Sequence, residues 1–297
     1  MSASNASVIF DAPGPRGRAI GRIIGIAGVV LCIVLGALAI YLLRGQLLNG
    51  DYWKIFLEAD TWRYYIADGL ANTLRAAGLA VVLSLVFGLV FGIARLSHVP
   101  FISVPAGIIV EFFRAVPVLM MMLLFYYFFL YNPNSLVSPE HYPFVGVVLG
   151  LTFYNGSVIA ELVRSGVHSL PKGQREAGMA IGLTRTQTLT SVLLPQAITA
   201  MLPSLLSQLV VVLKDTALGS IVTYPDLLRS IQTRFSGGGV MVALIVAAAM
   251  YIVLNYALTL LAAFVERRLR LRRAGKSVGT GVVPVRGTAN TNIRPEA

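Results

Sequence analysis

The sequence predicts an all-α fold, a polytopic transmembrane helical bundle with about six spans. Of its 297 residues, 56% are hydrophobic and only 12% are charged, whereas a soluble domain carries roughly 25% charged residues. Several apolar runs are also long enough to cross a bilayer, which takes about 20 residues of helix. We place the spans at residues 20–43, 70–94, 104–130, 144–163, 198–222 and 240–265.

The first span follows basic residues, and Ala-Leu-Ala at 37–39 imitates a signal-peptide cleavage site. Its apolar run continues past that site to Leu43, so we expect an uncleaved anchor helix. This helix and an outer loop make up the segment 19–67. We expect the two tails, 1–18 and the basic 269–297, to be disordered, because they are polar or lack periodicity.

The second and fifth spans each contain a cation. Arg75 lies one to two turns into the second span, and Lys214 closes the fifth beside Asp215. An anionic substrate crossing a low-dielectric bundle must meet a cation or a donor, because an unpaired buried charge is strongly disfavoured. Both are therefore candidates for a substrate path. The alternative is that Arg75 reaches the outer head groups and that Lys214 snorkels to the interface.

The third span contains Glu111 and Arg114, which are three residues apart and so share a helix face. We expect a local ion pair there.

Further polar residues lie at membrane depth, where they normally face protein or water. The fourth span carries Asn155 and Ser157 and ends near Glu161, and Gln208 in the fifth span extends a polar stripe of serines. We expect these four residues to line the substrate path. Hydrogen bonding between neighbouring helices is the alternative explanation of the stripe.

Basic residues are unevenly distributed between the loops. With the N-terminus inside, most Lys and Arg residues fall in cytoplasmic segments. The outer loops then hold only Arg44, Lys54, Arg63, Arg229 and Arg234. The positive-inside tendency therefore predicts that both termini are cytoplasmic. The net charge of +11 comes from basic residues distributed according to the membrane topology, and not from a face that could bind a nucleic-acid groove. We therefore expect no nucleic-acid partner.

Nothing in the sequence favours an enzyme or a metal site. Cys32 is the single cysteine, and the three histidines are scattered without ligand spacing. Gly-Lys-Ser at 275–277 resembles the end of a phosphate-binding loop, but Arg270 stands where that motif needs glycine. We therefore expect no cofactor, no catalytic residue and no ATP hydrolysis by this chain.

The polar segment between the fourth and fifth spans carries the most specific pattern. Glu176-Ala177 is followed by Gly182 and, further on, by Val-Leu-Leu-Pro ending at Pro195. This arrangement resembles the EAA loop of ABC-importer permeases, with Gly178 in place of the second alanine. The resemblance implies that 164–192 is a cytoplasmic coupling loop on which a partner ATPase acts. It assigns ATPase coupling to Lys172, Glu176, Ala177, Gly182 and Pro195.

Four further motifs narrow the resemblance. They are Phe-Arg-Ala-Val-Pro at 113–117, Asn-Gly-Ser-Val-Ile-Ala-Glu at 155–161, Ser-Leu-Pro-Lys-Gly-Gln at 169–174 and Leu-Lys-Asp-Thr-Ala-Leu at 213–218. They resemble the polar amino-acid branch of ABC permeases, the histidine, glutamate, glutamine and arginine importers. Together with the start of the chain at 11–16, the motifs are most similar to the second permease subunit of actinobacterial glutamate importers.

The resemblance implies an assembly. It places the chain in the plasma membrane of a bacterium, with a five-helix type I importer core over 68–268 and one extra N-terminal helix. The implied partners are a dimer of ATP-binding subunits, a second homologous or identical permease, an extracytoplasmic amino-acid-binding protein and membrane lipid. The function is then import of a polar amino acid, glutamate above all.

Two other classes of function remain open from the residues alone. A secondary transporter would need no ATPase but would usually show inverted repeats and broken ion-binding helices. A non-transporting membrane scaffold subunit is the second alternative.

Overall fold

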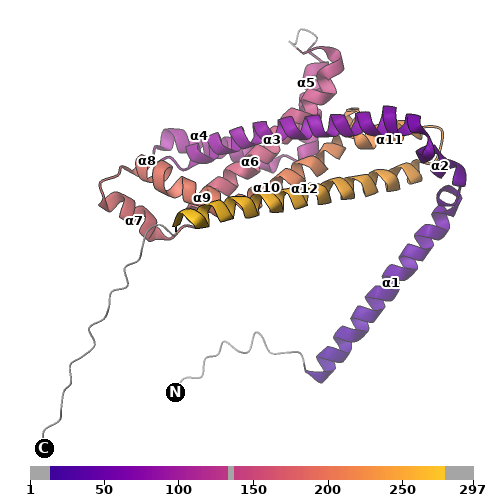
Figure 1. The fold of residues 1–297 in the computed structure, drawn as a ribbon, viewed down its shortest axis with the longest axis horizontal. Coiled ribbons are helices and arrows are strands. Elements are labelled where there is room, and N and C mark those ends of the chain that lie inside the picture. The colour runs from indigo at the N-terminus through magenta and orange to yellow at the C-terminus, as the bar shows by residue number, and fades with distance from the viewer. Residues whose placement is uncertain (1–13, 133–136, 278–297) are drawn as a thin grey trace, which may run out of the picture. The chain divides into compact units, whose positions relative to one another are not determined.

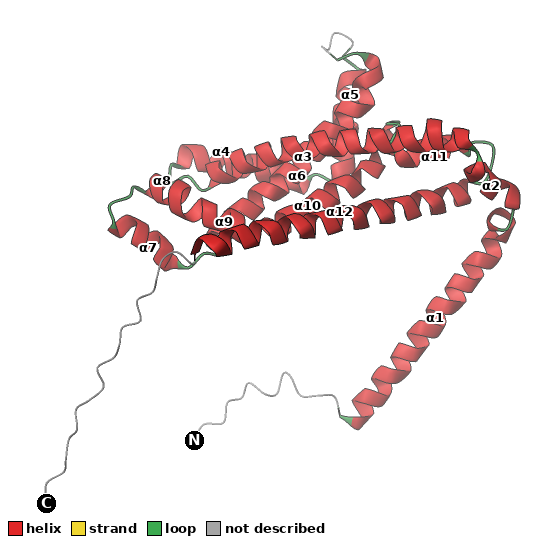
Figure 2. Cartoon of the chain, in the orientation of Figure 1, coloured by secondary structure: helices red, strands yellow, loops and turns green. Residues whose placement is uncertain are grey.

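The computed structural model describes residues 14–132 and 137–277, and within these ranges the chain forms helices and loops without a strand (Figures 1 and 2). Five helical segments are long and apolar enough to cross a membrane, or six if one bent pair counts as a span. The five are α1 (Pro15–Leu47), η2 with α3 (Thr61–Ile66 and Ala67–Arg95), η3 with α6 (Pro139–His141 and Tyr142–His168), α10 with η5 (Leu202–Asp215 and Thr216–Val222) and α12 (Val240–Ser277). The all-α transmembrane fold expected from the sequence is thereby confirmed.

The third expected span is not continuous. It consists of α4 (Pro100–Ala115) and α5 (Val118–Leu130), which are bent by 99°, and Figure 1 shows α5 leaving the direction of α4. Proline lacks a backbone N–H and disfavours helical geometry in the residue before it. Val116 and Pro117 are accordingly extended, with ψ angles of 127° and 137°. The span expected over 104–130 is therefore a pair of helices joined at Val116 and Pro117.

The long helices also extend beyond the expected tail boundaries. α1 begins at Pro15, before the expected boundary at 18, because proline suits the first position of a helix. α12 continues past 268 to Ser277, since adding residues to an existing helix avoids the cost of nucleation. The remainder of both expected tails lies outside the described residues.

Contacts divide the chain into two units. Unit 1 comprises the described residues up to Asn72 with Pro225–Ala249, and unit 2 comprises Thr73–Tyr224 with the described residues from Met250 on. This division differs from the expected boundary at 67, because a segment late in the sequence joins unit 1.

Unit 1 contains α2 (Gly50–Lys54), η1 (Ile55–Leu57) and α11 (Leu227–Arg234) as well as α1. α11 packs against the start of α3, where a Cβ atom on Gly69 would lie 2.8 Å from Cβ of Ser230. The rings of Phe56 and Phe235 stack with centroids 5.0 Å apart. A guanidinium–carboxylate pair also joins Arg234 to Glu58. Side-chain contacts over this long sequence separation hold the two parts of unit 1 together.

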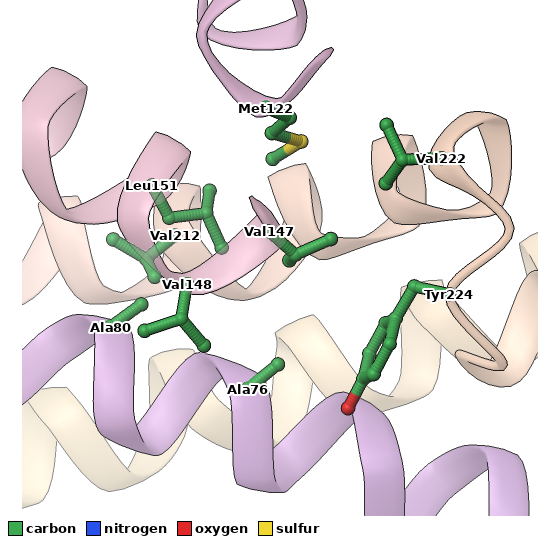
Figure 3. Packing of buried hydrophobic residues seen from close by; sticks show 9 residues of the cluster. All are labelled: Ala76, Ala80, Met122, Val147, Val148, Leu151, Val212, Val222 and Tyr224. Atoms are coloured by element: carbon green, nitrogen blue, oxygen red, sulfur yellow. The ribbon is translucent and has the colours of Figure 1, made fainter. Parts of the chain in front are cut away.

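The core of unit 2 forms around α6. Figure 3 shows Val147, Val148 and Leu151 of α6 surrounded by side chains from other elements of the unit. Those side chains are Ala76, Ala80, Met122, Val212, Val222 and Tyr224. Small residues permit this close packing: a Cβ atom on Gly150 would lie 2.8 Å from the backbone nitrogen of Met122. Helix association in lipid depends on such close van der Waals contact.

A second apolar cluster holds the segment after α6. This segment contains α7 (Lys172–Ala180), α8 (Arg185–Gln187), η4 (Thr188–Leu193) and α9 (Leu194–Ala200). Leu193 and Ala197 are buried in one cluster with Val163 and Val167 of α6. The polar segment is therefore attached directly to the central helix of unit 2.

Candidate coupling and substrate sites

The coupling segment contains a sharp turn at Gly182, whose φ angle is +87°. The N–H of Gly182 donates to the carbonyl oxygen of Met179 at 3.0 Å, and the N–H of Leu183 donates to that of Gly178 at 3.2 Å. These two bonds form a Schellman motif, in which glycine is favoured because it adopts a positive φ without strain. A Cβ atom on Gly182 would meet nothing within 4 Å. The backbone angle, and not a neighbouring group, therefore requires glycine here.

The next helix begins with a capping box. The hydroxyl of Thr184 accepts the backbone N–H of Gln187 at 3.3 Å, and the Gln187 side chain accepts the N–H of Thr184 at 2.9 Å. The two halves of the segment touch where a Cβ atom on Gly178 would lie 2.7 Å from Cγ2 of Thr188. The contact shows why glycine suits position 178, where the EAA pattern has alanine. We call residues 172–193, from α7 to η4, the coupling hairpin.

The structure brings the sequence-predicted coupling residues into one segment. Lys172, Glu176 and Ala177 are exposed on α7, Gly182 is exposed in the turn, and Pro195 is exposed in the first turn of α9. Gln196 Nε2 donates to Gln174 Oε1 at 3.1 Å, which ties α9 to α7. The hairpin thus offers an exposed surface on one side and is anchored to α6 on the other.

Glu161, predicted to lie on the substrate path, belongs to a charge network. Its carboxylate accepts from Arg95 Nη1 at 2.9 Å and from Arg164 Nη2 at 2.6 Å. Arg95 also binds Glu111 at 2.9 Å, and Arg114 binds Glu111 at 3.1 Å. The network therefore links α3, α4 and α6, and it contains the expected Glu111–Arg114 pair.

Arg95 is the residue of this network that the sequence did not reveal. Its side chain is only 12% exposed, and its two carboxylate partners lie 16 and 66 residues further along the chain. A cation at the end of an apolar run ordinarily indicates an interfacial residue. Only the folded arrangement of three helices identifies it as the centre of a network.

The predicted path residues Asn155 and Gln208 contact each other. Gln208 Nε2 donates to Asn155 Oδ1 at 2.6 Å, and Asn155 Nδ2 donates to the carbonyl oxygen of Leu151 at 3.0 Å. Asn155 and Ser157 are fully buried, and Ser157 bonds the carbonyl oxygen of Tyr154. The interhelical hydrogen bond that we considered as an alternative is therefore present between α6 and α10.

Thr152 adds a polar group to this region that the sequence analysis missed. It lies one helical turn before Asn155, is 6% exposed, and its hydroxyl has no hydrogen-bond partner among the described residues. A buried hydroxyl normally finds a partner. Its spacing of three from Asn155 is the signal that would have pointed to it.

The two candidate cations do not belong to the buried polar cluster. Arg75 is exposed on α3, and Lys214 is exposed at the end of α10. In the described part of the chain, no group of three His, Cys, Asp or Glu residues is arranged so that it could hold a metal ion.

The sequence of this chain is similar to a known protein family and to several known permeases. Residues 71–271 match the family of binding-protein-dependent transport system inner membrane components. The chain belongs to this family. It is 46% identical over 236 residues, covering 79% of this chain and 85% of the relative, to the glutamate transport system permease protein GluD of Corynebacterium glutamicum. It is 34% identical over 213 residues, or 70% of this chain and 94% of the relative, to the probable glutamine ABC transporter permease protein GlnP of Bacillus subtilis.

Solved structures show the same fold. An amino acid ABC transporter crystallised with histidines matches with a TM-score of 0.62 and 28% identity, covering 72% of this chain and 98% of that chain. The inward-facing MetNI methionine ABC transporter matches with a TM-score of 0.58 over 71% of this chain and 99% of that chain, at 18% identity. The latter shows a shared fold alone.

Membership of the family decides between the classes of function that the residues left open. The chain is a multi-pass membrane protein and a permease component of an ABC importer, not an enzyme. Relatives of this kind work with ATPase and substrate-binding partners. The secondary-transporter and scaffold alternatives are set aside, and the resemblance to the amino-acid branch of ABC permeases is confirmed.

Proposed function

We propose that this chain is the permease subunit of an ATP-driven importer that moves a polar amino acid, glutamate, into the cell. The observation that carries the proposal is the coupling hairpin, which is exposed on one side and anchored to α6 by buried side chains. Glutamate is proposed because the glutamate permease GluD is similar over most of both chains.

The proposed assembly follows from the hairpin and the charge distribution. Both termini lie in the cytoplasm, so that Lys172 and Glu176 face a dimer of ATP-binding subunits. A second permease, identical or homologous, completes the membrane domain, and an extracytoplasmic amino-acid-binding protein delivers the substrate. The chain itself moves the substrate across the membrane and makes or breaks no covalent bond.

The proposed mechanism couples the hairpin to the central helix. Closure of the ATPase dimer displaces the hairpin, and Leu193 and Ala197 pass the displacement to Val163 and Val167 of α6 through their buried contacts. The bundle has two states, one favoured by nucleotide and the other by its absence. Because α6 also carries Asn155, the same displacement alters the hydrogen bond to Gln208.

The proposed path runs along the polar cluster. Asn155, Ser157 and Gln208 supply hydrogen bonds to the substrate, and Thr152 contributes a hydroxyl that has no partner among the described residues. Glu161 closes the path as part of its charge network. Arg75 and Lys214 attract the acidic substrate from the exposed surface of unit 2.

A pair of glycine variants tests the coupling role. The complex is reconstituted in proteoliposomes with its ATPase and binding protein, and glutamate uptake and substrate-stimulated ATP hydrolysis are measured. Gly182→Val should lower both by about tenfold or more, since a β-branched residue at positive φ costs about 1–3 kcal/mol. Gly173→Val is the matched control, because Gly173 lies in α7 with no atom within 4 Å of a Cβ position.

Unchanged coupling in Gly182→Val, or an equal loss in Gly173→Val, would contradict this assignment.

The same uptake assay tests the substrate. Arg75→Gln should reduce glutamate uptake far more than Arg63→Gln, an exposed arginine in unit 1. Uptake of glutamine or arginine but not glutamate by the unmodified complex would overturn the choice of glutamate.

A further inference from the structure

A cavity of about 710 Å³ lies beside the coupling hairpin within unit 2. Figure 1 shows α4, α7 and α8 at one end of this unit. Arg95 is the last residue of α3 and His168 the last of α6, and both line the cavity. The cavity therefore lies at the level where two membrane-spanning helices end, which is the depth of lipid head groups.

Basic residues from several elements line this cavity. Arg175 comes from α7, Arg185 from α8, and His98 from the loop after α3, in addition to Arg95 and His168. The lining contains no Asp or Glu residue. Arg175 and Arg185 are exposed and form no ion pair within the described ranges. Arg95 is neutralised by Glu111 and Glu161, so the positive charge that the cavity offers comes from Arg175 and Arg185.

A buried hydroxyl also lines the cavity. Thr188 is 1% exposed, and its Oγ1 atom has no hydrogen-bond partner in the part of the chain that the structure describes. Such a group ordinarily finds a partner, protein or water. Because Thr188 lines the same cavity as Arg175 and Arg185, an oxygen-rich anion is a suitable ligand.

The remaining lining is apolar. Ile93, Leu96, Ile102, Leu189 and Leu193 contribute hydrocarbon surface next to the cations. A free inorganic anion gains nothing from such a surface, whereas an amphiphile with a charged head uses both parts. Basic pockets between transmembrane helices are known to suit anionic lipid head groups.

We propose that this cavity binds the head group of an anionic phospholipid. Arg175 and Arg185 hold the phosphodiester, and the glycerol and upper acyl carbons lie against the apolar residues. The cavity volume is in the range of sites for small organic ligands. Because α7 and η4 both line the cavity, the bound lipid stabilises the hairpin against the ends of α3 and α6.

The test measures lipid retention by the full chain. The permease is purified in mild detergent, incubated with phosphatidylglycerol or phosphatidylcholine, and analysed by native mass spectrometry. The unmodified chain should retain phosphatidylglycerol preferentially. An Arg175→Gln/Arg185→Gln variant should lose that retention by about 25-fold, from about fivefold per basic residue near a lipid surface. An Arg63→Gln/Arg229→Gln variant is the control, since both arginines are exposed and neither lines the cavity.

Equal retention by the two double variants would overturn the proposal. Displacement of the lipid by millimolar inorganic phosphate would show a free-phosphate site and overturn the lipid assignment. If the Arg175→Gln/Arg185→Gln variant keeps its lipid but fails to assemble with the ATPase, the cavity is a docking surface for an acidic segment of that partner and the proposal is also overturned.

Discussion

Helices α1 and α6 are both long and apolar, yet they differ in how much of their surface contacts protein. The most apolar stretch of α1 has a mean hydropathy of 3.0 and none of it is buried, whereas that of α6 has a mean hydropathy of 1.5 and 61% of it is buried. The less apolar helix is thus the more buried one. In a membrane, apolar side chains are satisfied by lipid, so hydropathy locates a span without indicating whether it packs against protein.

Glycine content does not explain the difference either. α1 contains Gly21, Gly25, Gly28 and Gly36, and a Cβ atom on any of them would meet nothing within 4 Å. On α6, by contrast, Gly146, Gly150 and Gly156 each contact a neighbouring helix. A small residue therefore contributes to packing only where a second helix presents a matching surface.

The largest effect is expected from filling a glycine on α6. Gly150→Leu should lower the free energy of unfolding by about 3 kcal/mol, at the upper end for overpacking, because the obstacle is the backbone of Met122. Gly28→Leu in α1 should have no measurable effect. Thermal unfolding in detergent measures both. A comparable loss in the two variants would break the contrast between α1 and α6.

A smaller effect is expected from the charge network on α6. Glu161→Gln should cost about 2 kcal/mol, less than the roughly 3–5 kcal/mol of a fully buried pair, because the Glu161 side chain is 22% exposed. Glu58→Gln removes the partner of Arg234 in unit 1, where the carboxylate is 53% exposed, and should cost about 0–1 kcal/mol. The same unfolding assay compares them. A larger loss of stability in Glu58→Gln would show that burial does not determine how much these ion pairs contribute to the free energy of unfolding.

The smallest effect is expected from the amide pair. A double-mutant cycle on Asn155→Ala and Gln208→Ala should give a coupling of about 0.6 kcal/mol, the average for hydrogen bonds between transmembrane helices. Ser207 bonds the carbonyl oxygen of Pro203 on its own helix, so a cycle on Asn155 and Ser207 should give none. Equal couplings would indicate a general loosening of α6 and not a specific bond.

The sequence by itself determined the features that depend on local chemistry. The apolar runs located the spans because a bilayer tolerates only long, internally bonded helices. The EAA-like pattern located the candidate coupling residues, among them Gly182, which lies in a turn at positive φ, where glycine is favoured. Pro117 was visible too, but the unbroken hydropathy around it concealed the 99° bend.

Only the tertiary structure decided which distant residues meet. Arg95 forms an ion pair with Glu161, which lies 66 residues away in the sequence. Gln208 forms a hydrogen bond with Asn155, which lies 53 residues away. The cationic cavity likewise draws Arg175 and Arg185 together with the ends of α3 and α6. Each of these pairings depends on how a helix is rotated about its axis. In a helix that is apolar on every face, the hydropathy pattern has little periodicity and does not indicate this rotation. Close packing at small residues determines the rotation instead.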